Sequence, residues 1–247
     1  REIYNNVPTA WGGQPGESIP RPQPSDFVKE YFQDKKDGFF IDVGASDGII
    51  WSTTLGLEVN NNWTGICIEP HPVIFNELNK LCGITVNDQH YNIGRAAECI
   101  KVAISDKEGE ADFLSFNGEW DAHMLSGLVD VIDPRQRERP DFSKHVSSAK
   151  VEKVQCKKLQ TILDERKITT VNYLSIDAEG SEINVLNSIN FDKVKFDLIS
   201  VEVNYEQEPI DTILNKRGYK FVKKVCQDCF YEKSWVFKFW AIIMYGN

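Results

Sequence analysis

An apolar run that leads into a glycine-containing turn, Phe39-Phe40-Ile41-Asp42-Val43-Gly44-Ala45-Ser46-Asp47-Gly48, is the most informative segment of the sequence. Its first five residues predict a short buried strand, because almost all are apolar and favour extended backbone. A similar run follows at residues 64–69, and Pro70 and Pro72 then open a segment whose apolar residues recur at helical spacing. Buried strands that alternate with helices predict a mostly parallel sheet with helices on both faces.

The same alternation continues through the second half of the chain. Further predicted strands share this apolar character and lie at residues 100–104, 173–177 and 198–203. A helix that carries Ile183, Leu186 and Ile189 is predicted between the last two. The final apolar segments, at residues 219–222 and 229–232, are close enough in sequence to pair as an antiparallel hairpin at the edge of the sheet. The predicted fold class is therefore α/β.

Composition divides the chain into four parts. Residues 1–24 hold half of the ten prolines and predict an extended arm, residues 25–233 form the domain, and residues 234–247 form an aromatic tail. Within the domain the alternation lapses at about residues 115–158, which predicts a long insertion. This insertion is rich in Lys and Arg from residue 133 onward. We interpret it as a solvated surface loop, with a lid over an anionic or polar substrate as the alternative.

Charge, hydropathy and cysteine spacing exclude several classes of protein. The 247 residues carry a formal net charge of −9, and the pI is about 5.1, which argues against a nucleic-acid partner because phosphate binding needs clustered cations. No apolar run approaches the ~20 residues of a transmembrane helix. The six cysteines are scattered, so we predict reduced, buried thiols in an intracellular, cytoplasmic protein.

Acidic residues stand at the ends of successive predicted strands, where an open parallel sheet binds its ligands. Asp42 and Asp47 flank the first turn, whose glycines allow close approach of a ligand to the backbone, and Glu69 ends the second strand. The turn is not a nicotinamide fingerprint, since Ser46 and Ile49 stand where glycines are required. A pocket that offers carboxylates to ribose hydroxyls and to positive charge, without a phosphate site, fits S-adenosylmethionine. The alternative is that Asp42 shapes a turn and Glu69 starts a helix.

The sequence resembles the FkbM-type S-adenosylmethionine-dependent methyltransferases from about residue 39 to residue 233. The resemblance rests on Phe40–Gly48, Trp63–Pro70, Ala103–Asp106 and, most specifically, Leu174-Ser175-Ile176-Asp177-Ala178-Glu179-Gly180-Ser181-Glu182; Gly218-Tyr219 and Asp228 also fit. It implies a Rossmann-like class I methyltransferase fold, with a mostly parallel seven-stranded sheet, an antiparallel C-terminal hairpin and helices on both faces. Residues 1–24 and the insertion lie outside the pattern.

The resemblance also implies where the cofactor lies. The turn after the first strand would border its methionine part, Glu69 would hold the ribose, and the segment from Ala103 to Asp106 would lie near the adenine. Asp177 would lie beside the methyl group and the acceptor. The predicted cofactor-binding residues are Asp42, Gly44, Ala45, Ser46, Asp47, Gly48, Glu69, Ala103, Ile104 and Ser105.

Transfer to an alcohol needs a group that takes the hydroxyl proton. Asp177 is the preferred base, and Glu179 and Glu182 are further candidates, although their charges also suit the start of a helix that begins near Glu179. His123 is a reserve candidate. Asp177 and Glu202 stand at the ends of adjacent predicted strands and could bind Mg²⁺; hydrogen bonding of the acceptor without a metal is the alternative.

The predicted activity is O-methylation of a sugar or glycan hydroxyl, because members of the resembling family mostly modify sugars or polyketide-type products. A polyketide-like acceptor and a non-catalytic nucleoside-binding module remain alternatives, and the missing glycines disfavour a nicotinamide oxidoreductase. The chain begins at Arg1 rather than Met. We therefore expect a processed form, or a domain of a larger, multidomain glycan-modifying protein.

Overall fold

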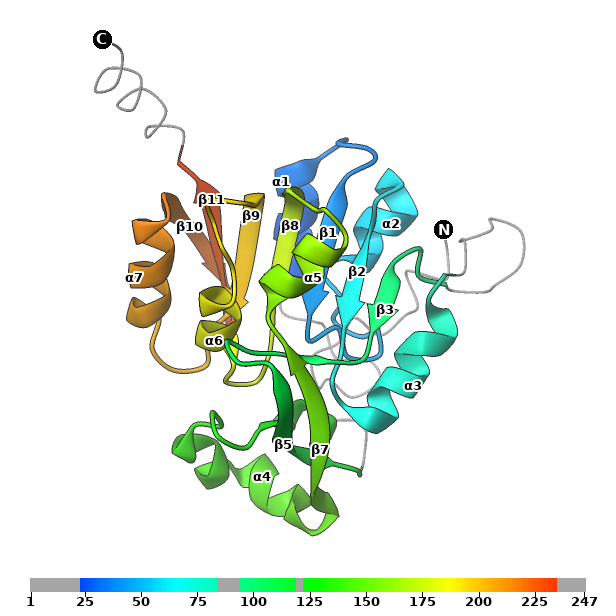
Figure 1. The fold of residues 1–247 in the computed structure, drawn as a ribbon, viewed down its shortest axis with the longest axis vertical. Helices are drawn as coiled ribbons and strands as arrows, with labels where there is room; N and C mark the ends of the chain where they lie inside the picture. Colours follow the sequence, from blue (N-terminus) through cyan, green and yellow to red (C-terminus); the bar gives the residue numbers. More distant parts are fainter. Residues whose placement is uncertain (1–22, 84–93, 119–121, 235–247) are drawn as a thin grey trace.

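A computed structural model describes residues 23–83, 94–118 and 122–234, and it contains two sheets (Figure 1). The larger has seven strands in the order β10-β11-β9-β8-β1-β2-β3. They are β1 (Phe39–Val43), β2 (Thr64–Ile68), β3 (Glu98–Ile100), β8 (Thr170–Ile176), β9 (Lys195–Glu202), β10 (Tyr219–Val225) and β11 (Asp228–Lys233). The five strands from β9 to β3 are parallel, whereas β11 is antiparallel to both β9 and β10. The predicted seven-stranded, mostly parallel sheet with its C-terminal hairpin is confirmed.

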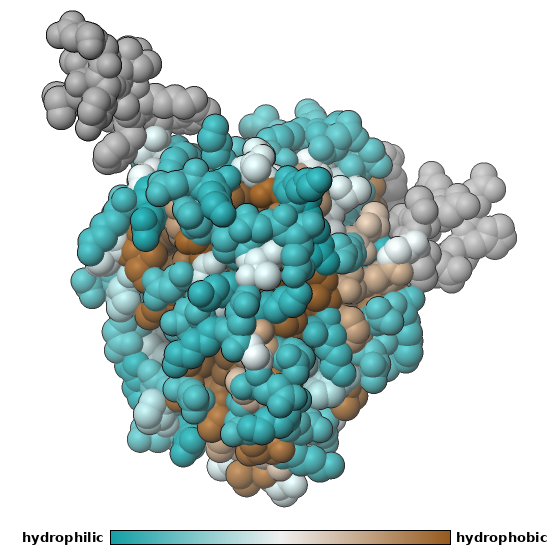
Figure 2. Space-filling view, viewed as in Figure 1, coloured by the Kyte–Doolittle hydropathy of each residue, from teal (hydrophilic) through white to brown (hydrophobic). Residues whose placement is uncertain are grey.

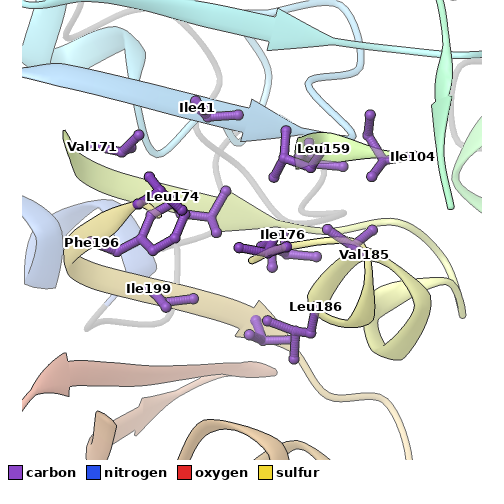
Figure 3. Packing of buried hydrophobic residues seen from close by; sticks show 14 of the residues in the cluster. Ile41, Ile104, Leu159, Val171, Leu174, Ile176, Val185, Leu186, Phe196 and Ile199 are labelled. Atoms are coloured by element: carbon purple, nitrogen blue, oxygen red, sulfur yellow. The ribbon is translucent and has the colours of Figure 1, made fainter. Parts of the chain in front are cut away.

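Helices cover both faces of this sheet, as predicted. One face packs against α5 (Leu159–Glu165), α6 (Glu182–Asn187) and α7 (Glu208–Lys216), through a buried cluster that includes Ile41 and Val43 (Figure 3). The other face packs against α1 (Pro24–Phe32), α2 (Leu55–Asn61) and α3 (Pro72–Leu81), through a cluster that includes Phe40. Adjacent residues of β1 therefore supply the two cores, because successive side chains of a strand point to opposite faces.

Residues 115–158, predicted as a surface loop, instead form much of a second sheet with short helices. This sheet has four strands in the order β4-β7-β5-β6, namely β4 (Ala103–Ile104), β5 (Gly109–Phe116), β6 (Gly127–Leu128) and β7 (Ala149–Lys157). Between β5 and β7 lie short helices: η1 (Ala122–Leu125), η2 (Pro134–Glu138), α4 (Pro140–His145) and η3 (Val146–Ser148). Figure 1 shows this sheet beyond the carboxyl ends of the main strands. The predicted strand at residues 100–104 is also split, since β3 joins the main sheet and β4 the second.

The cysteine prediction was wrong for one pair. Cys82, at the end of α3, and Cys99, in β3, form a disulfide across Cα atoms 5.9 Å apart, a spacing that suits such a bond. Cys67, Cys156 and Cys229 are buried thiols, as predicted, and Cys226 is exposed. The spacing of the cysteines in the sequence does not reveal this pairing, because the two residues come together only through the crossover from β2 to β3.

The surface is mainly polar on the face drawn in Figure 2, where hydrophobic side chains gather in smaller patches. In the part of the chain that the structure describes, no helix has the length and apolar character needed to cross a bilayer. The proline-rich arm up to residue 22 and the aromatic tail from residue 235 lie outside the described residues, so both remain predictions.

Candidate active site

A cavity lies at the carboxyl edge of the main sheet, between that edge and the second sheet. The ends of β1 and β2, the loop from Ile49 to Thr53, and the segment after β8 form one side. Ala103, Ile104, Phe113 and Leu128 of the second sheet, together with His123, form the other. The position is the one that the topology of an open parallel sheet favours for ligands.

Five neighbouring strands each bring a carboxylate to this cavity. In the sheet order β11-β9-β8-β1-β2 these are Asp228, Glu202, Asp177, Asp42 and Glu69. Asp228 was not among the predicted site residues, although it fits the family pattern. It reaches the site because β11 runs antiparallel, so the start of β11 pairs with the end of β9, with Asp228 opposite Glu202. Asp228 could have been predicted only from knowing that β11, rather than β10, pairs with β9. The pattern of apolar residues in the sequence does not give that strand order.

Glu69 is buried and held in place by two backbone amides. Its carboxylate accepts hydrogen bonds from Ser46 N at 2.9 Å and from His71 N at 2.7 Å. Burial raises the pKa of Glu69 to about 7, against the effect of these two donors. Each carboxylate oxygen keeps a lone pair for a further donor. The side chain of His71 caps α3 by accepting from the amides of Val73 and Ile74, which is a structural role.

Gly44 is required by the chain itself rather than by a ligand. Its φ is +85°, and a Cβ at this position would overlap the carbonyl oxygen of Asp177. The backbone of Asp177 also donates from its N–H to the Val43 carbonyl at 2.9 Å. The sequence predicted that a ligand approaches this backbone closely. In the structure, the backbone that approaches Gly44 is the end of β8. This contact fixes the position of Asp177 relative to the first turn.

Several predicted cofactor residues line the cavity and others support it from behind. Asp42, Gly44, Ala45, Ser46, Glu69, Ala103 and Ile104 line the cavity. Asp47, Gly48 and Ser105 are not among its lining residues. The Asp47 carboxylate accepts from the amides of Ile49 and Ile50, both at 2.9 Å, and so shapes the loop that continues into the cavity wall.

A buried arginine that the sequence did not reveal anchors this loop. Arg95 is fully buried and pairs with Glu58 at 2.9 Å. Its guanidinium also donates to the Gly48 carbonyl at 2.6 Å and to Thr54 Oγ1 at 2.7 Å. Thr54 in turn donates to the Asp42 carboxylate at 2.7 Å. The segment before β3 thus supports the loop between β1 and α2, residues 44–54. We call it the cofactor loop because several predicted cofactor residues lie in it. The contact joins residues more than forty positions apart in the sequence.

Asp177, Glu179 and Glu202 form a cluster in which one carboxylate oxygen from each residue lies within 4.8 Å of the others. A hydrogen bond between the Asp177 and Glu202 side chains lowers the pKa of Asp177 and raises the pKa of Glu202. Asp177 opens to the cavity, yet loss of bulk water there raises its pKa to about 7, with a further contribution from neighbouring carboxylates. Burial and repulsion by Asp177 also raise the pKa values of Glu179 and Glu202.

Glu179 and Glu182 do not both lie at the start of the helix, as the sequence analysis expected. Helix α6 begins at Glu182 rather than near Glu179, and Glu179 lies in the preceding turn with a φ of 49°. The Glu182 carboxylate accepts from the amides of Ala178 and Gly180, both at 3.0 Å. These contacts favour the structural alternative for Glu182, which holds the turn that carries Glu179. Glu179 itself lines the cavity.

His123 also reaches the cavity, from η1 on the side of the second sheet. Its Nε2 lies 3.1 Å from Ser46 Oγ. The contact joins the second sheet to the first turn of the main sheet. His123 stays a reserve candidate for proton transfer.

A family model for the methyltransferase FkbM domain matches residues 42–221 of this chain. The chain belongs to the FkbM methyltransferase family. The match begins at Asp42, at the end of β1, and includes every carboxylate of the cavity except Asp228. The resemblance to the FkbM methyltransferases that was drawn from the sequence is therefore confirmed.

One solved FkbM methyltransferase structure shares the fold, and other methyltransferase structures match it less closely. The FkbM methyltransferase of Methylobacillus flagellatus is 13% identical with a TM-score of 0.51, and the match covers 94% of this chain and 50% of that chain. The chain therefore spans about half the length of that FkbM protein. The N-terminal domain of human METTL16 in complex with SAH is 15% identical over 93% of this chain and 76% of that chain, with a TM-score of 0.45. A Pyrococcus furiosus methyltransferase is 12% identical over 94% and 95%, with a TM-score of 0.42. A comparison with curated protein sequences finds no match.

Proposed function

We propose that this FkbM methyltransferase transfers a methyl group from S-adenosylmethionine to a hydroxyl group of a sugar or glycan. The row of carboxylates at the carboxyl edge of the main sheet carries the proposal. It offers acceptors for a ribose at one end, in Glu69, and for an alcohol at the other, in Asp177 and Glu202. A polyketide-like alcohol is the alternative acceptor.

The residues present fit S-adenosylmethionine. Glu69 is held rigidly, with lone pairs left for the ribose hydroxyls, and Ala103 and Ile104 supply apolar surface for the adenine. The cofactor, when bound, supplies an electrophilic methyl group on a positively charged sulfonium. Carboxylates around the cavity favour that positive charge over the neutral product, S-adenosylhomocysteine. The cavity therefore suits binding of the charged donor and release of the neutral product.

Asp177 is the proposed base. It lies where Gly44 fixes the end of β8 against the first turn, so an acceptor hydroxyl beside Asp177 can be aligned with the methyl carbon. With S-adenosylmethionine bound, the donor would supply the methyl group to the acceptor oxygen, and the Asp177 carboxylate would take the hydroxyl proton. Glu202, hydrogen-bonded to Asp177 and to Asn204 at 2.7 Å, holds the Asp177 side chain in position.

Mg²⁺ at Asp177, Glu179 and Glu202 is the alternative way to hold the acceptor. Three carboxylate oxygens suit Mg²⁺. We favour transfer without the metal, because Asp177 and Glu202 are hydrogen-bonded to each other and Mg²⁺ would have to replace that contact. A transfer assay with added Mg²⁺ and with a chelator distinguishes the two.

A methyl-transfer assay across mono- and oligosaccharides and polyketide-like alcohols tests the proposed function. Methylated sugar is the expected product, and methylation of the polyketide-like alcohols alone would transfer the proposal to that class. Calorimetry with S-adenosylmethionine and S-adenosylhomocysteine tests the cofactor separately. No binding of either would contradict the enzyme assignment and leave a non-catalytic module.

Replacing Glu69 by Ala is expected to weaken S-adenosylhomocysteine binding about 10- to 100-fold, because hydrogen bonds to a charged acceptor contribute about 1.5–3 kcal/mol. The measurement is the dissociation constant by calorimetry. Glu77→Ala, on the exposed side of α3, is the matched control and should leave affinity unchanged. Unchanged affinity in Glu69→Ala would contradict the ribose assignment.

Cofactor binding is expected to depend on pH. The pKa values of Glu69, Asp177 and Asp228 are each raised to about 7 from ordinary values near 4, mainly by burial. Such groups stabilise the fold at pH values below their unfolded pKa, and this contribution is lost as pH rises through 7. The melting temperature without cofactor should therefore fall between pH 5.5 and 8.

Over the same range, the affinity ratio of S-adenosylmethionine to S-adenosylhomocysteine should rise severalfold, because more of the carboxylates become charged. A ratio that does not change with pH would show that the carboxylates do not interact with the sulfonium charge.

The cellular compartment is a separate proposal. The predicted cytoplasmic location rested on reduced cysteines, whereas disulfides such as Cys82–Cys99 persist mainly in oxidising compartments. We propose an oxidising compartment, which also suits modification of glycans. Alkylation of the protein from its native source, followed by mass spectrometry, should find Cys82 and Cys99 protected and Cys226 modified. Modification of Cys82 and Cys99 without prior reduction would support the cytoplasm.

A further inference from the structure

The lining of the cavity is rich in acidic side chains. Among the described residues that line it, six are Asp or Glu and none is Lys or Arg. The six are Asp42, Glu69, Asp177, Glu179, Glu202 and Asp228. A bound anionic group would therefore face several carboxylates and no Lys or Arg side chain of the described lining, and burial at the sheet edge strengthens that repulsion. The lining therefore disfavours acceptors that carry a phosphate or a carboxylate group.

Three arginines near the cavity are paired with acids. Arg95 is buried beneath the cofactor loop against Glu58. In the second-sheet region, Arg135 pairs with Asp133 and Glu206, both at 2.6 Å, and Arg139 pairs with Asp141 at 2.6 Å. These ion pairs do not support the earlier alternative of a basic lid over an anionic substrate.

Asp228 lies at the acceptor end of the carboxylate row. It is two strands away from Asp177 in the sheet order, which corresponds to roughly 10 Å between backbones at the usual strand spacing. The side chains of Asp177 and Asp228 can therefore contact different hydroxyl groups of a single sugar ring. Proton transfer needs only the first of these contacts, so the second can serve recognition.

Trp51 adds an aromatic surface to the same cavity. It lies in the loop after β1, is partly buried, and has a φ of 58°. A bulky residue in this left-handed conformation is unfavourable and persists only where the surrounding structure enforces it. Ile49 and Ile50 line the cavity beside it. A flat aromatic ring near carboxylates matches a sugar, which has an apolar C–H face and hydroxyls around its rim.

We infer that the acceptor is an uncharged sugar residue, with its apolar face against Trp51 and a second hydroxyl, beside the one that is methylated, held by Asp228. This inference rests on the proposed function and restricts its substrate class. It excludes uronic acids, phosphosugars and other sugars whose anionic group must enter the cavity. Asp228 and Trp51 are the specificity residues, and neither is required to take the proton.

The test compares neutral methyl hexosides with the matching methyl uronides, with S-adenosylmethionine as donor. For the hexoside that the enzyme methylates best, kcat/KM should exceed that of its uronide at least 100-fold. Asp228→Asn should raise KM for the neutral sugar about 10-fold and reduce the discrimination against the uronide at least 10-fold. Trp51→Ala should raise KM for the sugar about 10-fold. Trp51→Phe keeps an aromatic ring, so its KM should lie close to that of the unaltered protein.

Controls separate recognition from folding. Asp228→Asn and Trp51→Phe should bind S-adenosylhomocysteine within threefold of the unaltered protein, and Asp192→Asn, on the exposed loop before β9, should change none of these values. A uronide methylated as well as its hexoside, or better, would overturn the inference while leaving sugar methylation intact. Cofactor binding without methylation of any sugar would instead overturn the proposed function, and this inference with it.

Discussion

The Asp177→Asn variant is expected to lose about 1,000-fold in kcat while binding S-adenosylhomocysteine within threefold of the unaltered protein. General base catalysis typically contributes 100- to 10,000-fold, and an amide cannot accept the hydroxyl proton. The substitution should leave the site geometry in place, because the Asp177 backbone makes the contacts with Gly44 and Val43. Single-turnover kinetics with saturating acceptor measure the chemical step directly.

Glu202 provides the sharpest comparison for this variant. Its carboxyl group is hydrogen-bonded to Asp177, so Glu202→Gln should lower kcat less than Asp177→Asn and shift the pH at which activity appears. Asp192→Asn, exposed at the opposite edge of the sheet, should leave kcat unchanged. Near-normal turnover in Asp177→Asn would remove Asp177 from the role of base and direct attention to Glu202 or His123.

The main sheet could be predicted from sequence because its strands are buried on both faces. The bounds of β1 agree with the apolar run at residues 39–43, and the C-terminal hairpin follows from two apolar segments close in sequence. The second sheet could not be predicted in this way. In β7, Lys, Glu and Gln interrupt the apolar residues and most of the strand is not buried, so the continuous apolar run of a buried strand is absent.

The candidate site shows the same limit at the level of single residues. Acids that directly follow buried parallel strands, such as Glu69 and Asp177, could be placed at one edge from the strand pattern alone. Asp228 stands at the start of its strand and reaches that edge only because β11 is antiparallel. Arg95 lies just before β3 and supports a loop that precedes it by about forty residues. Contacts of this kind depend on strand order, which local sequence does not specify.

Arg95→Met is expected to be the most destabilising of these substitutions. It removes the partner of Glu58, whose carboxylate is fully buried, and breaking a buried ion pair from one side typically costs about 3–5 kcal/mol. The donors to Gly48 and Thr54 are lost as well, so the cofactor loop loses its support. Because 1 kcal/mol shifts the melting temperature of a domain this size by roughly 2–4 °C, the decrease should be about 10 °C. S-adenosylhomocysteine binding, measured below that transition, should weaken at least 10-fold.

Two further variants separate the charge of Arg95 from its geometry. Arg95→Lys keeps the charge opposite Glu58 but cannot reach Gly48 and Thr54 together, so it should recover part of the melting temperature and little of the cofactor affinity. The double variant Arg95→Met with Glu58→Leu removes both buried charges and should be more stable than Arg95→Met alone. Arg217→Met, on the exposed end of α7, is the surface control. Full cofactor affinity in a folded Arg95→Lys protein would show that Arg95 stabilises the domain without positioning the cofactor loop.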